Sequence, residues 1–212
     1  MMVDDHIALR DALGGCINEM DQFEVIAVAS NGNEAIHKLE IGTIPDMMLL
    51  DLSMPGMGGY ETAKIVCSKY PLIKVVIFTM FNSDISLTRL IRVGAKAFLR
   101  KDIEPLQLQK ALEYIANGGF FYGDKEMGKF TEILRDGHDH LKLFKKNIMT
   151  ETEITFLQLA STDLTYKAIA DIMQMSPRKI DHFRDNLFAK LDVKSRVGLA
   201  MFAFKNGLVN ME

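Results

Sequence analysis

The sequence predicts an α/β protein in two parts, a doubly wound sheet of five parallel strands followed by a small all-α domain. Short apolar segments alternate with amphipathic helical segments over residues 1–117. From residue 149 onward we find only helical periodicity and helix caps. The charge also changes sign. Residues 1–144 carry 15 Lys and Arg against 20 Asp and Glu (−5), residues 145–212 carry 10 against 8 (+2), and the sum is the −3 of the whole chain. A mildly basic second part is compatible with DNA binding.

The first part alternates strands and helices in a regular order. The predicted strands are Met1–Val3, Glu24–Ala29, Met47–Asp51, Lys74–Thr79 and Ala97–Leu99. The predicted helices are His6–Glu19, Gly32–Ile41, Gly59–Lys69, Ile85–Val93 and Pro105–Ala116. Strands that are separated by helices form parallel sheets covered on both faces.

The first strand is unusually short. Three residues span about 10 Å, whereas typical strands have five or six residues. We expect that the chain starts late, through a misassigned start or a truncation, and a truly short strand is the alternative. The intact mass of the native protein would distinguish the two.

The second part is marked by helix caps. Thr150 and Glu153 form a capping box before an apolar helix. Thr165 is predicted to cap the helix Tyr166–Met173, and Ser176 with Pro177 opens the helix Arg178–Leu191. Ser195 caps a last helix that runs to Asn206. We therefore expect domains at residues 1–119 and 148–212.

Residues 120–147 are predicted to be a linker, with a possible short helix near Lys125–Leu134. His138 and His140 could suggest a metal site, but no third ligand has suitable spacing, so a solvated linker is favoured. Cys16 and Cys67 are interpreted as reduced core residues of a cytoplasmic protein. No apolar stretch is long enough to span a membrane, and the N-terminus has no signal-peptide pattern.

Polar side chains stand at the ends of four predicted strands. Asp4 and Asp5 follow the first strand, Asp51 ends the third, Thr79 ends the fourth and Lys101 follows the fifth. Carboxylates bind hard cations through oxygen, Asp51 can act as a nucleophile, and Thr79 and Lys101 can meet phosphoryl oxygens. These residue types predict a Mg²⁺-assisted phosphoryl acceptor. Structural alternatives are a helix cap for the first two acids and an ordinary solvated lysine.

In this order, the residues and motifs resemble the receiver domain of two-component response regulators. The C-terminal third resembles the LuxR-type helix-turn-helix, so the chain is similar to NarL/FixJ-class regulators over nearly everything except the linker. The resemblance implies a flavodoxin-like receiver with strand order 2-1-3-4-5. It also implies that a sensor histidine kinase phosphorylates Asp51. The implied Mg²⁺ ligands are Asp5, Asp51, the backbone carbonyl of Ser53 and, through water, Asp4.

The resemblance also assigns the remaining receiver positions. Thr79 and Phe98 are the expected switch residues, and Lys101 matches an aromatic-x-x-Lys pattern that begins at Phe98. Asp102 stands where many members carry proline or a small residue, which leaves the local peptide geometry open. A nucleotide site is the rival use of such a sheet, but Gly14–Gly15 lies inside a predicted helix rather than after a strand.

The helix Arg178–Leu191 is the expected recognition helix in the major groove of double-stranded DNA. Its apolar stripe faces the core and consists of Ile180, Phe183, Leu187 and Leu191. The candidate DNA-binding residues are Arg178, Lys179, His182, Arg184, Asp185, Asn186, Lys194, Ser195 and Arg196. Asn186 and Asp185 can read bases, whereas Lys179 and Arg184 suit phosphates. Asp181 occupies an often basic position, so the operator preference does not transfer.

The favoured function is a phosphorylation-controlled transcription regulator that forms a homodimer on activation. Apolar residues in the last helix suggest that helix as the dimer contact, Val197 and Met201 among them. We expect the unphosphorylated receiver either to cover the recognition helix or to hold the last helix away from its dimer partner. Such a receiver catalyses only its own modification and is not an enzyme with turnover. The alternative is a phosphorylation-independent regulator whose receiver is a protein-docking module.

Overall fold

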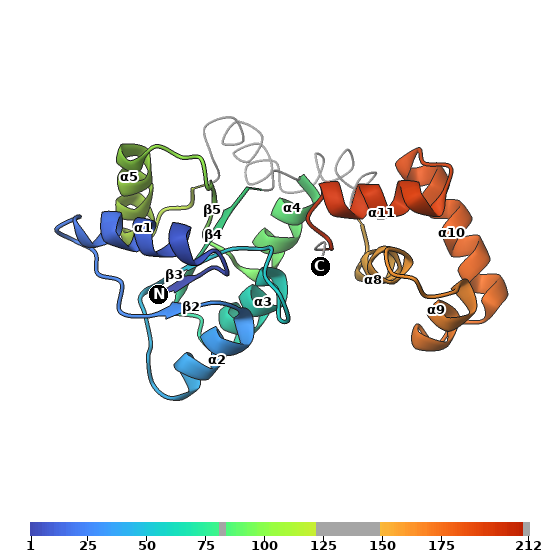
Figure 1. Cartoon of the computed structure of the whole chain (residues 1–212), viewed down its shortest axis with the longest axis horizontal. Coiled ribbons are helices and arrows are strands. Elements are labelled where there is room, and N and C mark those ends of the chain that lie inside the picture. The colour runs from blue at the N-terminus through green and yellow to red at the C-terminus, as the bar shows by residue number, and fades with distance from the viewer. Residues whose placement is uncertain (81–83, 122–148, 210–212) are drawn as a thin grey trace.

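A computed structural model describes residues 1–80, 84–121 and 149–209 of the chain (Figure 1). The first domain contains a five-stranded parallel sheet in the order β2-β1-β3-β4-β5, which confirms the predicted topology. The strands are β1 (Met2–Val3), β2 (Val28–Ala29), β3 (Met47–Leu50), β4 (Lys74–Thr79) and β5 (Ala97–Arg100). β3 and β4 are almost entirely buried, as strands covered on both faces should be.

Five helices cover the sheet, and they are α1 (Ile7–Asn18), α2 (Gly32–Glu40), α3 (Gly59–Lys69), α4 (Asp84–Val93) and α5 (Pro105–Ala116). Helices α1 and α5 lie on one face, and α2, α3 and α4 lie on the other (Figure 1). Each face has its own apolar cluster. Leu39 and Val66 belong to one, and Leu108 and Ile115 belong to the other.

The centre of the sheet is its shortest part. Met2 pairs with Val28 on one side and with Leu49 on the other, and the pairing of β1 ends one residue later. The expected strand over residues 24–29 is therefore wrong in extent, since β2 contains only Val28 and Ala29. Residues 24–27 have strand-forming side chains, but β1 is too short to pair with them through a full set of backbone hydrogen bonds.

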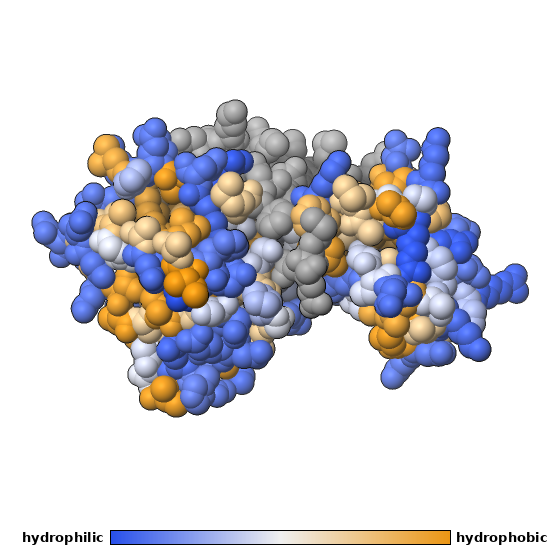
Figure 2. Space-filling model, in the orientation of Figure 1, coloured by the Kyte–Doolittle hydropathy of each residue, from blue (hydrophilic) through white to orange (hydrophobic). Residues whose placement is uncertain are grey.

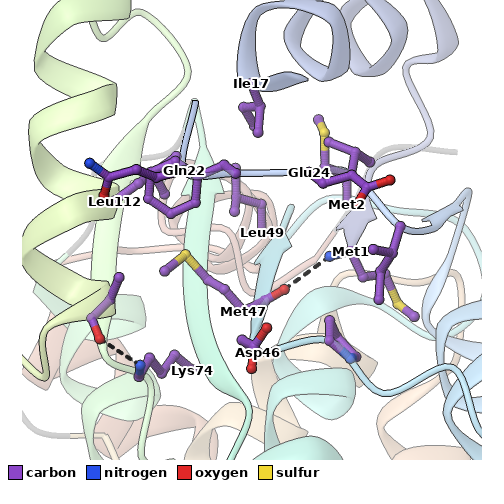
Figure 3. A pocket seen from close by; sticks show the side chains of 15 residues that line it. Met1, Met2, Ile17, Gln22, Glu24, Asp46, Met47, Leu49, Lys74 and Leu112 are labelled. Atoms are coloured by element: carbon purple, nitrogen blue, oxygen red, sulfur yellow. Dashed lines mark hydrogen bonds between the residues drawn. The ribbon is translucent and has the colours of Figure 1, made fainter. Parts of the chain in front are cut away.

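A pocket of about 330 Å³ opens beside the start of β1, at the opposite end of the strands from Asp51 (Figure 3). The Met1 ammonium group donates a hydrogen bond of 3.0 Å to the Met47 carbonyl there, and Lys74 Nζ donates to the Ala116 carbonyl at 2.8 Å. Burial lowers the pKa of the Met1 amine to about 6, against the opposing effect of Asp46. Because these groups lie far along the strands from the carboxylate cluster, the pocket is not part of that site.

The second domain consists of α8 (Glu151–Ala160), α9 (Tyr166–Ile172), α10 (Pro177–Leu191) and α11 (Arg196–Lys205). The predicted caps are confirmed, including the reciprocal Thr150–Glu153 capping box and the Thr165, Ser176 and Ser195 caps. The aromatic ring of Phe156 anchors the core and lies 6.2 Å from Tyr166 and 5.6 Å from Phe183, centroid to centroid.

Three other expectations concern the connections and surface. Phe121 pairs with Ala97 at the edge of β5, while the predicted linker helix and the His138–His140 segment lie outside the described residues.

The assignment of Cys16 to the core is wrong, because its side chain is exposed, off the buried face of α1. Cys67 is half-buried, and both thiols are free. In the described ranges, no helix has the length and apolar character needed to cross a membrane.

Candidate functional site

The structure brings the polar strand ends together at one edge of the sheet. Lys101 Nζ lies 2.8 Å from Asp51 Oδ2 and 2.8 Å from Asp4 Oδ2. The exposed fractions are small, 3 % for Asp51, 4 % for Asp4 and 0 % for Thr79. A buried ammonium group that joins two buried carboxylates fixes the geometry of all three side chains.

Backbone contacts hold Asp51 in place. The Asp51 N–H donates to the Val3 carbonyl at 2.9 Å, and the Leu52 N–H donates to Asp51 Oδ1 at 2.8 Å. Gly59 begins α3 directly behind this turn, and a Cβ atom at this position would lie 2.0 Å from the Asp51 carbonyl oxygen. Since that distance is far below van der Waals contact, the path of the chain after β3 requires a residue without a side chain.

The electrostatics follow from burial and from the ion pairs. Burial raises the pKa of Asp51 above its ordinary value, and hydrogen bonds from Lys101 and Thr79 oppose that rise. For Lys101, burial works to lower the pKa, but hydrogen bonds to Asp4 and Asp51 prevail and raise it. The pairing therefore favours the charged form of Lys101, which faces the carboxyl groups of both Asp4 and Asp51.

The donor set fits a hard divalent cation. One ligand atom each from Asp4, Asp5, His6 and Asp51 can lie within 4.8 Å of all the others. Carboxylate oxygens at this spacing suit Mg²⁺, and Ser53 is half-buried in the loop just after Asp51. Asp4, Asp5 and Asp51, three members of the predicted ligand set, lie together, and their binding of Mg²⁺ stays a prediction.

Two residues near these acids were not anticipated from the sequence. The sequence predicts His6 only as the start of a helix, but its Nδ1 lies 3.0 Å from Asp5 Oδ1 and 3.3 Å from Asp4 Oδ1. Arg10 is buried in α1 and donates to the Asp4 carbonyl at 3.1 Å and to Ser30 Oγ at 2.9 Å. The signal for Arg10 is a basic residue three positions after the start of α1, directly after the apolar residues Ile7–Leu9.

Phe98 lies in β5 and is 4 % exposed. It neighbours Ile77 of β4 across the sheet, two residues before Thr79. The aromatic side chain therefore belongs to the core on the α4 side of the sheet. The structure shows Phe98 in a buried position, and its alternation between buried and exposed positions stays a prediction.

The candidate DNA-binding residues lie on two surfaces of the second domain. Ile180 and Leu187 turn into the core, which confirms the predicted apolar stripe of α10. The exposed candidates are Arg178, Lys179, His182, Asp185, Asn186, Lys194 and Ser195. In Figure 2, hydrophilic side chains cover the outer edge of this domain, along which α10 runs in Figure 1.

Two of the candidate arginines are engaged within the protein. Arg184 donates to Asp181 at 3.0 Å and to Asp185 at 2.9 Å. Arg196 donates to the carbonyls of Ala160 and Thr162 at 2.8 and 2.7 Å, where α8 ends. These contacts give Arg196 a structural use, and a phosphate would have to compete for Arg184 with two carboxylates.

Comparison with known proteins agrees with both halves of the fold. Residues 1–113 match the family described as response regulator receiver domain, and residues 147–203 match the bacterial regulatory proteins of the luxR family. The transcriptional regulatory protein LiaR of Bacillus subtilis (strain 168) is 29% identical over 210 residues, which cover 99% of this chain and 98% of LiaR. A nitrate/nitrite response regulator protein homolog of Haemophilus influenzae is 30% identical, with coverages of 97% and 95%.

Solved structures with this fold include RcsB of Salmonella enterica serovar Typhimurium, bound to the promoter rprA in the presence of the phosphomimetic BeF3-. The TM-score is 0.67 at 19% identity, with 95% of each chain covered. Receiver domains of response regulators generally use Mg²⁺ for phosphorylation, and the acidic cluster of this chain is compatible with that use. From its two family matches and its relatives, the chain belongs to the response regulators that join a receiver domain to a LuxR-type DNA-binding domain and regulate transcription.

Proposed function

We propose that Asp51 accepts a phosphoryl group from a phosphohistidine of a sensor histidine kinase, and that this modification controls DNA binding. The observation that carries the proposal is the placement of Lys101 Nζ, 2.8 Å from both Asp51 and Asp4, beside the buried Thr79. It supports a site that is assembled before its substrate arrives, so that little reorganisation is needed during transfer.

The residues would divide the work of transfer among them. Asp5, Asp51 and the Ser53 carbonyl would hold Mg²⁺ directly and Asp4 would do so through water; the bound ion supplies positive charge against the carboxylates and the phosphoryl oxygens. The Lys101 ammonium group and the Thr79 hydroxyl donate to phosphoryl oxygens. An Asp51 oxygen bonds to phosphorus while the P–N bond breaks, and its electron pair stays on the imidazole nitrogen, which takes up a proton. The product is the modified receiver itself, and so we do not class the protein as an enzyme.

The transferred group would then act on the switch residues. Movement of the Thr79 hydroxyl towards a phosphoryl oxygen would vacate space at the end of β4. Phe98, which is already buried on the same side of the sheet, would repack into that space. The receiver would therefore exist in two arrangements, one before and one after the movement of Thr79 and Phe98. Phosphorylation can shift the equilibrium between them only by the difference in its interaction energy with the two.

We propose further that α10 enters the major groove of double-stranded DNA as the recognition helix. Base edges would be read by Asn186 and Asp185, with His182 beside them. The phosphates would be bound by Arg178, Lys179 and Lys194, and by the N-terminus of α11 at Ser195. Solved structures of RcsB, which has this fold, include complexes with DNA and support DNA binding by the second domain. A homodimer would form through α11, on which Val197 and Met201 are 71 and 51 % exposed.

Incubation with acetyl phosphate and Mg²⁺, followed by intact-mass measurement, tests the acceptor assignment. The wild-type chain should gain the mass of one phosphoryl group, and Asp51→Asn should gain none while keeping its fold. Asp11→Asn removes an exposed carboxylate from α1 and serves as the matched control, which should still be phosphorylated. If Asp51→Asn took up phosphate, Asp51 would not be the acceptor. If the wild-type chain took up none, the docking-module alternative would replace the proposal.

A further inference from the structure

The ring of His6 is turned towards the carboxylates of the candidate ion site. Its Nδ1 atom lies 3.0 Å from Asp5 Oδ1 and 3.3 Å from Asp4 Oδ1. His6 directly precedes α1, but its side chain makes no capping hydrogen bond to that helix. The side chain is 65 % exposed, so packing does not force the ring against the acids either. Neither helix capping nor core packing therefore accounts for the position of this imidazole.

The neighbouring acids differ in how far their oxygens are already engaged. Asp4 Oδ1 accepts from the His6 backbone N–H at 2.9 Å, and Asp4 Oδ2 lies 2.8 Å from Lys101 Nζ. Asp51 accepts through Oδ1 from the Leu52 N–H and through Oδ2 from Lys101. Asp5 Oδ1, in contrast, is buried and has no hydrogen-bond partner in the described part of the chain. Since buried polar atoms are normally satisfied, this oxygen is suited to a metal ion.

The geometry allows one ion to be shared by the imidazole and the acids. One ligand atom each from Asp4, Asp5, His6 and Asp51 lies within 4.8 Å of the other three. When the ring proton is on Nε2, Nδ1 carries a lone pair that can bind a metal. In the other tautomer, Nδ1 donates to Asp4 Oδ1 instead, and this hydrogen bond is the structural alternative to metal binding. The exposed ring can adjust its position, whereas the buried acids are held in place.

An imidazole nitrogen changes which ion such a site prefers. Oxygen ligands alone suit Mg²⁺, which keeps several of its water molecules when it binds to a protein. Imidazole nitrogen instead suits first-row transition ions such as Co²⁺ and Zn²⁺. His6 should therefore add little to the affinity for Mg²⁺, but it should replace a water molecule on a transition ion.

We propose that His6 Nδ1 is a further ligand of the ion site and gives this receiver a preference for a divalent transition ion over Mg²⁺. Asp5, Asp51 and the Ser53 carbonyl would hold either ion, and His6 would bind only the transition ion. This inference rests on the proposed function, because the transition ion would occupy the Mg²⁺ site of phosphoryl transfer. The supply of such an ion would then decide which metal the receiver carries.

Calorimetric titration of the full chain with Co²⁺ and with Mg²⁺ tests the preference. His6→Gln removes the candidate ligand, and His37→Gln, which removes an exposed imidazole from α2, is the matched control. His6→Gln should bind Co²⁺ at least about tenfold more weakly, since even groups that only orient a metal ligand change affinity by about 10–100-fold. Its Mg²⁺ affinity should match the wild type, and the control should match the wild type for both ions. An unchanged Co²⁺ affinity, or equal losses for the two ions, would overturn the role of His6.

Proton NMR of the Co²⁺-loaded chain gives a direct readout of ligation. Paramagnetic Co²⁺ shifts the ring N–H signal of a coordinated imidazole far outside the usual range, and the signal disappears in D₂O. The wild type and His37→Gln should show this signal, His6→Gln should lack it, and excess Mg²⁺ should remove it by competition for the site. A signal that persisted in His6→Gln would assign the ligand to another histidine and overturn the proposal.

The two titrations also separate this inference from the proposed function. Mg²⁺ binding without any effect of His6→Gln on Co²⁺ would overturn the role of His6 alone. A wild-type chain that bound neither ion would overturn both the role of His6 and the proposed Mg²⁺ site.

Discussion

The edge of the receiver sheet and the outer surface of α10 use charge in opposite ways. At the sheet edge, Lys101 is enclosed between Asp4 and Asp51, and all three side chains are almost fully buried. On α10, Lys179 and Asn186 extend into solvent. Backbone geometry therefore fixes the first set before any ligand binds, whereas the DNA would fix the second. Substitutions at the sheet edge should change stability and activity together, and those on α10 should change binding alone.

The largest effect should come from Gly59→Ala, which attacks the backbone that holds Asp51. The new Cβ atom would lie 2.0 Å from the Asp51 carbonyl oxygen and 2.7 Å from Leu52 Cα, so β3 or α3 must move. We expect a loss of about 3 kcal/mol or more in the free energy of unfolding, measured by urea denaturation. Gly15→Ala is the control, because a Cβ atom at that position meets nothing within 4 Å. Its free energy of unfolding should rise by about 0.5–1 kcal/mol, since alanine favours the helix more than glycine does. A loss below about 1 kcal/mol for Gly59→Ala would show that the turn adapts.

Lys101→Ala should have the next largest effect. It leaves Asp4 and Asp51 buried without their cation, which costs about 3 kcal/mol of stability in the absence of divalent ions. Added Mg²⁺ should stabilise this variant more than it stabilises the wild type, as seen in thermal unfolding with and without the ion. The variant should still be phosphorylated but should no longer convert phosphorylation into dimerisation. Lys179→Ala is the control on α10, and its stability should stay within about 0.5 kcal/mol of the wild type.

Asn186→Ala should change DNA recognition without changing the fold. The side chain is exposed, and a bidentate contact with one base contributes about 1–3 kcal/mol of discrimination. Selection of binding sites from random DNA should return a motif that has lost its preference at a single position. An unchanged motif would remove Asn186 from the base-reading residues.

Lys179→Ala and Lys194→Ala should weaken binding to all sequences alike. Each lost phosphate contact should reduce the slope of log affinity against log salt by about 0.9. Arg184→Ala should have a smaller effect on this slope, because Asp181 and Asp185 already pair with its guanidinium. Titrations at several salt concentrations would measure the three slopes. An Arg184→Ala slope change as large as that of Lys179→Ala would mean that DNA displaces the two carboxylates.

The smallest effect concerns Asp51 and pH. Because burial raises the pKa of Asp51 in the folded protein, the wild-type chain loses stability as pH rises from the ordinary pKa of an aspartate to the raised pKa of Asp51. Asp51→Asn should therefore be slightly more stable than the wild type at neutral pH without divalent ions, and the gain should vanish in acid below the ordinary pKa of an aspartate. Asp181→Asn, an exposed control, should show no such gain at neutral pH. A destabilised Asp51→Asn would mean that the Lys101 pair outweighs burial.

The sequence was sufficient where local chemistry and burial agree. Apolar strand segments followed by Asp51, Thr79 and Lys101 located the sheet edge, and the Thr150 and Ser176 caps located the helices of the second domain. The extent of β2 could not be predicted, since it depends on the length of its neighbour rather than on its own residues. The same holds for the salt bridge of 3.1 Å between Arg89 of α4 and Glu151 of α8, because long-range pairing between two domains leaves no periodic pattern in a sequence.

The two-residue β1 strand divides the sheet into a well-supported part, β3 to β5, and a weakly supported margin formed by β1 and β2. Local opening should begin at such a margin, where few backbone hydrogen bonds resist amide exchange. Asp4 and Asp5 belong to the margin, while Asp51 belongs to the well-supported part. A divalent ion bound by these carboxylates would therefore link the weakly supported margin to the rest of the sheet. Ion binding should slow amide exchange in β1 and β2 more than in β3 to β5. In this receiver, the ion that assists phosphoryl transfer would also stabilise the two short strands β1 and β2.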